Sequence, residues 1–297
     1  MSEQEIVGPA SSHYVSQRLK IHFVDWGNES APPLLLIHGG KDHARSWDWT
    51  ARRLREHYHV IAPDLRGHGD SAWAIGGQYT MPEFVLDLAQ LVDTLGLAPV
   101  RIVAHSMGAA VSLFYAGVFP DRVRKLVAIE GMGIPPSIGA RIEGREPWEA
   151  VSDWIEQVRD CSRRQPRRYA SIDEAAARMQ SENSFLSPEQ ARHLTVHGVA
   201  RNEDGTFSWK FDNASRPFFP HRMPRESMER LWARIDCPTL LIHGSESWHG
   251  DPGRDGRAGL IRDAEVLEIQ GAGHWVHHDQ LDPFLAATTV FLADVDR

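Results

Sequence analysis

Two patterns of hydrophobic and polar positions alternate along this chain of 297 residues. Short, uninterrupted apolar runs are typical of parallel strands that are buried on both faces. Amphipathic segments, such as 83–95 and 107–119, lie between them and place their apolar residues on one helical face. The apolar runs occupy residues 33–37, 59–62, 100–104, 125–129, 239–242 and 265–269.

The alternation of strands and helices predicts an α/β fold, with a mostly parallel sheet and helices on both faces. Segments 14–19 and 20–26 instead alternate polar and apolar residues around a polar turn, which predicts an antiparallel hairpin at the sheet edge. The hairpin brings the expected sheet to eight strands. Because ligands of such sheets bind at the carboxyl ends of the strands, we expect the chemistry there.

The regular alternation stops between residues 135 and 232, where no buried strand pattern occurs. Helical patterns cover 148–164, 172–181 and 188–197 instead. We interpret 135–232 as a helical lid, inserted into one core domain formed by 1–134 and 233–297.

Composition narrows the possible partners. A net charge of -8 and a pI near 6.0 argue against nucleic acid and anionic membrane surfaces. The start of the chain lacks the features of a secretory signal and no apolar stretch approaches the length of a membrane span, so we expect a cytoplasmic protein without a membrane partner. The two cysteines lie far apart in the sequence, so we expect no disulfide. The histidines are not accompanied by cysteines or carboxylates at the spacing of metal ligands, so we expect no metal site.

Ser106 lies in Ala104-His105-Ser106-Met107-Gly108, between an apolar run and a helical pattern. A serine at the apex of such a strand–turn–helix is exposed for attack, provided that the residues two before and two after it are small. Ala104 and Gly108 meet this condition, although the usual pattern has Gly at the first position. We predict that Ser106 is a nucleophile.

An attacked carbonyl develops a negative oxygen, which needs two fixed hydrogen-bond donors. His38-Gly39-Gly40 ends the first apolar run, and Met107 begins the helix after Ser106, where the helix dipole adds positive potential. We predict that the amides of Gly40 and Met107 form this oxyanion hole. The side chains of His38 and His105 are expected to contact the substrate.

His274 lies in a loop after the last apolar run, and Gly271 and Gly273 allow that loop to bring the imidazole over the sheet edge. We predict that His274 is the general base. Glu130 directly ends the run 125–129, where an unpaired charge would be costly, and an imidazolium would be its partner. A capping or lid-anchoring role for Glu130 is the alternative. His277 and His278 are expected at the surface or behind the site.

The elbow at Ser106, the turn Asp-Leu-Arg-Gly-His-Gly-Asp-Ser at 64–71 and the Gly-Ala-Gly-His loop at 271–274 together resemble the α/β-hydrolase superfamily. The resemblance covers about residues 13–293. It implies the α/β-hydrolase fold with a lid and a reaction that needs no cofactor. The 64–71 turn is interpreted as structural.

One departure from that family concerns the acid. Members most often carry Asp after the strand that follows the lid, where this chain has Ser247, with Glu246 one residue away and Asp251 farther along. Haloalkane dehalogenases instead place the acid before the lid, as Glu130 would be, but they attack with Asp. The segments 204–212 and 237–248 resemble the serine-nucleophile branch of the serine hydrolase-like and mesoderm-specific transcript proteins, which implies a Ser-His-Glu triad.

These residues predict a serine hydrolase that cleaves a carboxylic ester, thioester or lactone through an acyl-enzyme. A hydrolase of C–C or amide bonds and a non-catalytic ligand receptor on the same fold are the alternatives. Aromatic residues near the site predict a small-molecule substrate with an apolar group. They are Trp148, Trp154, Phe185, Trp209 and Phe218 in the lid, and Trp275 beside the base.

Overall fold

A computed structural model describes residues 8–133, 145–215 and 223–293. Its centre is an eight-stranded sheet in the order β1-β2-β4-β3-β5-β6-β9-β10. The β1–β2 and β2–β4 pairs are antiparallel, and the other neighbours are parallel. The strands are β1 (Ala10–Ser16), β2 (Leu19–Asp25), β3 (Pro33–Ile37), β4 (His59–Pro63), β5 (Val100–His105), β6 (Val123–Ile129), β9 (Thr239–Gly244) and β10 (Ala264–Ile269).

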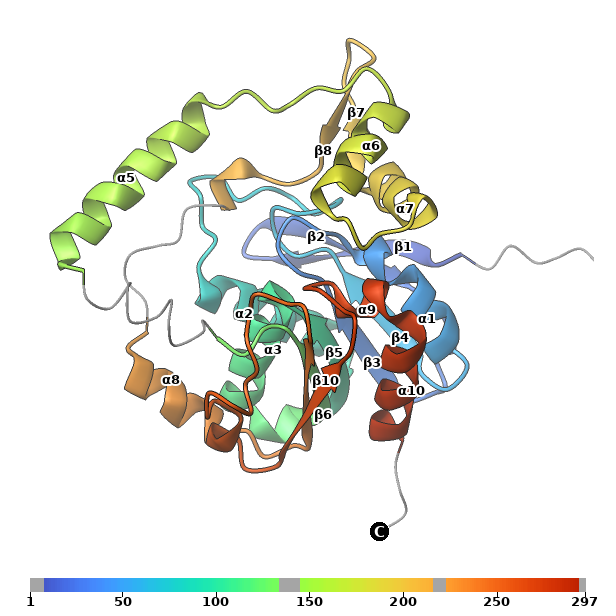
Figure 1. The fold of residues 1–297 in the computed structure, drawn as a ribbon, viewed down its shortest axis with the longest axis vertical. Coiled ribbons are helices and arrows are strands. Elements are labelled where there is room, and N and C mark those ends of the chain that lie inside the picture. Colours follow the sequence, from blue (N-terminus) through green and yellow to red (C-terminus); the bar gives the residue numbers. More distant parts are fainter. Residues whose placement is uncertain (1–7, 134–144, 216–222, 294–297) are drawn as a thin grey trace, which may run out of the picture.

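Helices cover both faces of the sheet (Figure 1). One face packs against α2 (Met81–Thr94), α3 (Met107–Val118) and α8 (Arg225–Trp232), and the other against α1 (Asp48–Leu54) and α10 (Leu281–Leu292). The short helix α9 (Val276–Asp279) precedes α10. None of the described helices combines the length and apolar character needed to cross a membrane.

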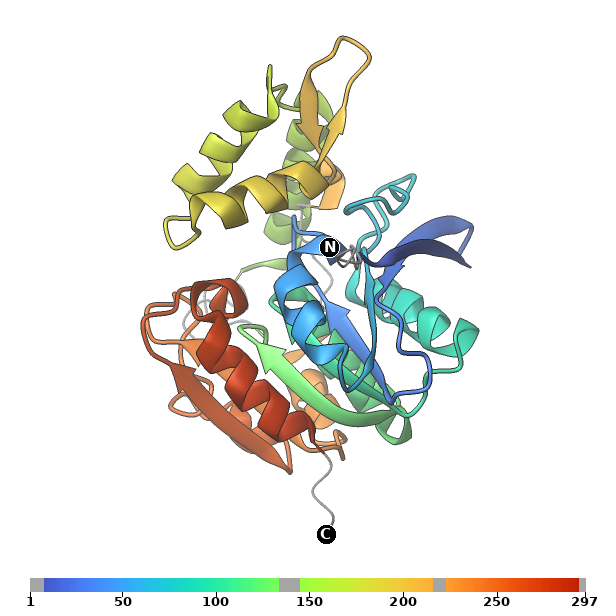
Figure 2. The same ribbon diagram turned by 90° about the vertical axis from the view of Figure 1, so that its right-hand side faces the viewer.

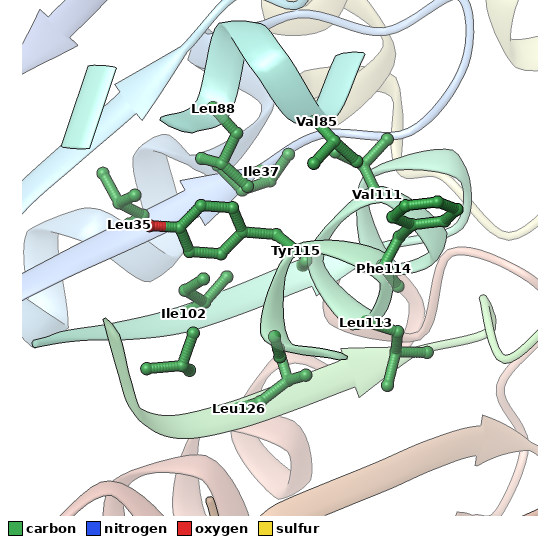
Figure 3. Close-up of a cluster of buried hydrophobic side chains, with 14 of the residues drawn as sticks. Leu35, Ile37, Val85, Leu88, Ile102, Val111, Leu113, Phe114, Tyr115 and Leu126 are labelled. Carbon is green, nitrogen blue, oxygen red and sulfur yellow. The ribbon is translucent and has the colours of Figure 1, made fainter. Parts of the chain in front are cut away.

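Each face has its own apolar core, because alternate side chains of the central strands point to opposite sides. Leu35, Ile37 and Ile102 pack with α2 and α3, and the Tyr115 ring of α3 lies among them (Figure 3). Leu34 and Leu36 pack on the other face with α1 and α10. Residues of both cores are almost fully buried, so the central strands hold the site on a rigid base.

All six apolar runs that predicted strands are strands of this sheet, and the predicted hairpin is β1 and β2, with slightly different ends. The prediction that the last run is buried was wrong. β10 is the edge strand of the sheet, and only Ile269 at its end is buried. An edge strand has a single neighbour, so fewer side chains cover it.

Most of the segment between β6 and β9 lies over the carboxyl ends of the strands (Figure 2), whereas its last helix, α8, packs on one face of the sheet. Two β-strands within it form a hairpin that the sequence did not predict. The segment comprises α5 (Pro147–Arg163), α6 (Ile172–Glu182), α7 (Pro188–Gly198), β7 (Val199–Arg201), β8 (Phe207–Trp209) and α8. The described part is called the insertion below.

Side chains and backbone groups join the insertion to the core at several points. The carbonyl of Leu194 accepts a hydrogen bond from His43 at 2.9 Å, and Gln190 donates to the carbonyl of His278 at 3.0 Å. On the other side of the insertion, the Tyr79 hydroxyl donates to Asp212 at 2.6 Å. These contacts hold α7 and the segment after β8 against the loops that follow the strands.

The turn at 64–71 is structural in this fold. The Asp64 carboxylate accepts hydrogen bonds from the Ala44 amide at 2.6 Å, the Asp70 amide at 2.8 Å and the His22 ring at 2.7 Å, and these donors hold its pKa below the usual value. Arg66 is fully buried and donates to both oxygens of Asp87 on α2, at 2.6 and 2.8 Å.

We predict that Asp87→Asn lowers the free energy of unfolding by about 3–5 kcal/mol, because it removes the only carboxylate that forms hydrogen bonds with the buried Arg66 guanidinium among the described residues and leaves Glu83 at 4.0 Å as its remaining acidic neighbour. Chemical denaturation measures the change. Asp93→Asn is the control on the same helix: its partner Arg122 is a surface residue, so the loss should stay below about 1 kcal/mol. Equal losses for the two variants would contradict the assigned role of the Arg66–Asp87 pair.

Candidate active site

Ser106 lies in a tight turn between β5 and α3. Its backbone has φ +50°, a left-handed conformation that is unusual for a residue with a side chain. Its amide donates to the carbonyl of Ile129 at 2.8 Å, which fixes the turn against β6. Residue 108, two positions after Ser106, must be glycine, because a Cβ there would lie 2.4 Å from the carbonyl oxygen of His38. The sequence around Ser106 therefore adopts the predicted strand–turn–helix.

Glu130 follows β6 and also has a left-handed backbone, with φ +53°. Only 2% of the residue is exposed. Its Oε1 accepts a hydrogen bond from the Gly244 amide at 2.7 Å, and its Oε2 accepts one from the Ser247 hydroxyl at 2.5 Å. A buried carboxylate with these fixed donors keeps one orientation, which points Oε2 toward His274.

The three side chains predicted for catalysis lie together. His274 Nε2 is 3.0 Å from Ser106 Oγ, and His274 Nδ1 is 3.2 Å from Glu130 Oε2. A carboxylate only accepts hydrogen bonds, so Nδ1 carries the proton and Nε2 is free to accept the serine proton. This arrangement can activate a hydroxyl group for attack on a carbonyl carbon.

The two predicted oxyanion amides belong to turns that meet at Ser106. Gly39 lies so close to the serine that a Cβ on it would be 3.2 Å from Ser106 Cβ and 2.8 Å from His105 Nδ1. Gly40 follows it, and Met107 is the first residue of α3, where helix amides have no partner within the helix. Within the described chain, neither amide donates to another residue.

The predictions of substrate contact for His38 and His105 were wrong for this structure, because both rings are buried. His38 is fully buried, accepts the Leu65 amide at Nε2 at 2.9 Å and donates from Nδ1 to the Gly39 carbonyl at 2.7 Å. Burial lowers its pKa to about 3, so the ring stays neutral. His105 is 1% exposed and donates from Nε2 to the His274 carbonyl at 2.9 Å, so it positions the backbone of His274.

Two of the predicted substrate-binding tryptophans pack against small apolar clusters. The Trp209 ring contacts Tyr169 in a small core of the insertion, and its Nε1 donates to the Tyr169 hydroxyl at 3.2 Å. Trp275 packs against the core formed by Leu186 and Leu194 of the insertion. Both side chains are only partly buried, so their contact with the substrate stays a prediction.

Among the remaining lid aromatics, Trp148 and Phe185 are exposed, Trp154 of α5 is partly exposed, and Phe218 is not described. Trp148 is 69% exposed on α5, a helix that buries none of its side chains, and its contact with the substrate stays a prediction. Phe185 lies against Gly273 beside the base, since a Cβ on Gly273 would be 2.9 Å from its ring. Phe218 lies outside the described residues.

Several groups at the site were not assigned from the sequence. Ser247 and the Gly244 amide orient Glu130, and both come from the end of β9. Trp248 follows Ser247, is 66% exposed, and has its ring centre 5.2 Å from that of His274. An exposed tryptophan in a loop after a strand end was a usable signal, because ligands bind at such ends.

His277 and His278 are buried, which excludes the surface position considered for them. The His277 ring stacks on Trp47, with 4.3 Å between ring centres, and burial lowers the pKa of both histidines. Asp42, His105 and His277 offer ligand atoms within 4.8 Å of one another, but all three side chains are enclosed. These three residues are at most 5% exposed.

The chain belongs to the α/β-hydrolase family, whose model matches residues 32–281. A 2-hydroxy-6-oxo-2,4-heptadienoate hydrolase of Pseudomonas putida is 29% identical over 287 residues, which cover 93% of each chain. The lipase LipV of Mycobacterium tuberculosis is 38% identical, over 38% of this chain and 42% of the lipase.

Solved structures with this fold include a thioesterase domain from the curacin biosynthetic pathway. It superimposes with a TM-score of 0.81 at 22% identity, covering 95% of this chain and 99% of the domain. An E-2-(acetamidomethylene)succinate hydrolase gives a TM-score of 0.76 at 22% identity, covering 96% and 99%. These comparisons identify the chain as a hydrolase-fold protein.

Asp279 supports the loop of His274 and should make stability depend on pH. Its Oδ2 accepts the Gly273 amide at 2.9 Å, and burial raises its pKa from 3.8 to about 6. Between these pH values the folded chain retains a proton that the unfolded chain releases. The contribution of Asp279 to stability therefore falls as the pH rises from about 4 to about 6, and is constant above that.

We predict that Asp279→Asn removes this dependence. Unfolding by urea should show that the wild type loses about 1–2 kcal/mol relative to the variant across that pH range. Asp282→Asn, at an exposed position of α10, is the control and should parallel the wild type. A constant difference between wild type and Asp279→Asn from pH 4 to pH 7 would contradict the prediction.

Proposed function

We propose that this protein is a serine hydrolase that cleaves a carboxylic ester, or a related thioester or lactone, with Ser106, His274 and Glu130 as its triad. The observation that carries the proposal is the continuous chain from Ser106 Oγ to His274 Nε2 at 3.0 Å and from His274 Nδ1 to Glu130 Oε2 at 3.2 Å. The left-handed backbone of both Ser106 and Glu130 supports it, because such strain gathers at functional sites.

In the proposed reaction, Ser106 Oγ attacks the carbonyl carbon while its proton moves to His274 Nε2. The Glu130 carboxylate remains ionised and stabilises the imidazolium. The amides of Gly40 and Met107 donate to the oxyanion, and the imidazolium then gives its proton to the leaving alcohol. His274 next takes a proton from water, which attacks the acyl-enzyme carbonyl. The imidazolium then returns that proton to Ser106 Oγ as the acyl–oxygen bond breaks and the acid leaves.

The surroundings of the base favour an apolar group in the substrate. Trp248 presents an exposed ring beside His274, and Phe185 lies against Gly273 on the same loop. We propose that these two rings contact the acyl or alcohol group. The insertion would then act as the lid, as its position over the strand ends suggests (Figure 2).

Hydrolysis of a C–C or amide bond is the second candidate. It is supported by relatives aligned over nearly the whole chain that are named hydrolases of 2-hydroxy-6-oxo-2,4-heptadienoate and 2-(acetamidomethylene)succinate. Both names denote substrates with carboxylate groups, whereas the rings closest to His274 belong to Trp248, His105 and His249. A panel of p-nitrophenyl esters, thioesters, anilides and vinylogous 1,5-diketones separates the two candidates by their relative kcat/KM.

We predict that a fluorophosphonate probe labels Ser106 and that Ser106→Ala abolishes both labelling and ester hydrolysis. The reason is that the probe reacts with a serine activated by a neighbouring imidazole. Mass spectrometry of the labelled peptide locates the adduct. Ser181→Ala, on the surface of α6, is the control and should label fully. Folded wild-type protein that resists labelling at every pH would instead support a non-catalytic receptor.

We predict that Glu130→Gln lowers kcat by about 10³- to 10⁴-fold with the fold retained, because an amide can hold His274 in the wrong tautomer. Adding Ser247→Asp to the Glu130→Gln variant should raise its kcat at least about tenfold. The Ser247 hydroxyl is 2.5 Å from Glu130 Oε2, so a carboxylate at residue 247 can approach the same nitrogen of His274.

Glu246→Gln is the matched control, since Glu246 is exposed one residue before Ser247. Its kcat should remain within about twofold of the wild type. The assignment of the acid fails if Glu246→Gln is the damaging substitution, or if Glu130→Gln hydrolyses esters at the wild-type rate.

A further inference from the structure

Three side chains with metal-binding groups meet on the outer part of the sheet, where β9 pairs with β10. His243 and Glu268 are partners in the register of these parallel strands, so their side chains lie on the same face. Asp251 reaches them from the loop after β9. His243 Nε2 is 3.6 Å from Asp251 Oδ1 and 3.9 Å from Glu268 Oε2, and all three ligand atoms lie within 4.8 Å of one another.

These separations are longer than hydrogen bonds but suit atoms that share one metal ion. Zn²⁺ binds imidazole nitrogen and carboxylate oxygen at about 2.0–2.2 Å in a tetrahedral arrangement, which places two ligand atoms about 3.4 Å apart. Small side-chain rotations of Asp251 and Glu268 would bring their oxygens to that spacing. Both carboxylates are partly exposed, at 20% and 35% of the side chain, so an ion can enter from solvent.

The charges at this cluster favour a cation. His243 is 4% exposed, and its ring makes no hydrogen bond to any of the described residues although it faces two carboxylates. Glu268 uses only Oε1, which accepts from Gln270 at 2.6 Å. Two acids therefore face one buried imidazole, whose lone pair would complete a set of ligands.

The partners of Asp251 leave room for such a ligand. Its Oδ1 accepts the amides of Gly253 and Arg254 at 2.7 and 3.2 Å, and its Oδ2 is 3.2 Å from Arg254 Nε. The Arg254 side chain is 82% exposed, so it can move away at little cost. By contrast, the cluster of Asp48 with His193 and His197 already has Arg45 bound to both carboxylate oxygens.

We propose that His243 Nε2, Asp251 and Glu268 bind one Zn²⁺ ion or a similar first-row dication, with water as the remaining ligand. The ion would fasten the loop after β9 to β10. That loop carries Ser247, which donates to Glu130, and Trp248, which lies beside His274. An ion bound here therefore holds the groups that orient the proposed acid, although it touches none of the reacting atoms.

The test is a titration of the full chain with Zn²⁺, after removal of metals with a chelator and with no histidine tag. We expect one high-affinity site per chain in competition with a chromogenic chelator, and a rise in Tm with Zn²⁺. Glu268→Gln should weaken binding at least about tenfold and abolish the rise in Tm. Glu265→Gln is the control, because Glu265 is exposed on the opposite face of β10.

The proposal is overturned if no stoichiometric site exists or if Glu268→Gln binds Zn²⁺ as the wild type does. It is also overturned if His274→Gln, rather than Glu268→Gln, removes the site, since the ion would then occupy the triad. Should ester hydrolysis be absent altogether, the binding measurements stand independently, so the failure of the proposed function and the failure of this site are distinguishable.

Discussion

The geometry of the site depends on one buried carboxylate. Glu130 is 2% exposed, and its oxygens accept hydrogen bonds from Gly244 and Ser247 of the β9 end and from His274 of the loop after β10. A buried charge without partners costs several kcal/mol, so these segments are stable only when they meet at this carboxylate. The position of the imidazole over Ser106 follows from that requirement.

The segments that contact Glu130 can approach one another because their backbones pack closely. Ser106 and Glu130 directly follow the register partners His105 and Ile129 of adjacent strands, and both have left-handed backbone. Each such residue costs about 1–3 kcal/mol, which the two buried cores of the sheet must offset. Gly131 is needed beside them, because a Cβ there would lie 2.3 Å from the Ser106 carbonyl oxygen. The unfavourable backbone conformations of Ser106 and Glu130 and the tight packing of Gly131 thus occur at the same place.

The sequence predicted the strands, the turn at Ser106 and the two side chains that contact the His274 ring nitrogens, because apolar runs and glycines leave local signals. It did not predict what a side chain packs against. His38 satisfies the Leu65 amide from a neighbouring strand, and Trp209 fills a small core with Tyr169. Both contacts depend on tertiary neighbours, as does the exposure of β10. Residue type alone therefore does not show them.

The position of Glu130 links two neighbouring strands. Glu130 follows β6, and its Oε2, which faces His274, also accepts the hydroxyl of Ser247 from the loop after β9. One carboxylate oxygen is thus shared by groups that follow β9 and β10. Because β6 and β9 are neighbours in the sheet, a side chain from either strand end can reach this position. The length of the glutamate side chain suits the approach from β6, because its Oε1 reaches the Gly244 amide at the end of β9 while its Oε2 reaches both Ser247 and His274.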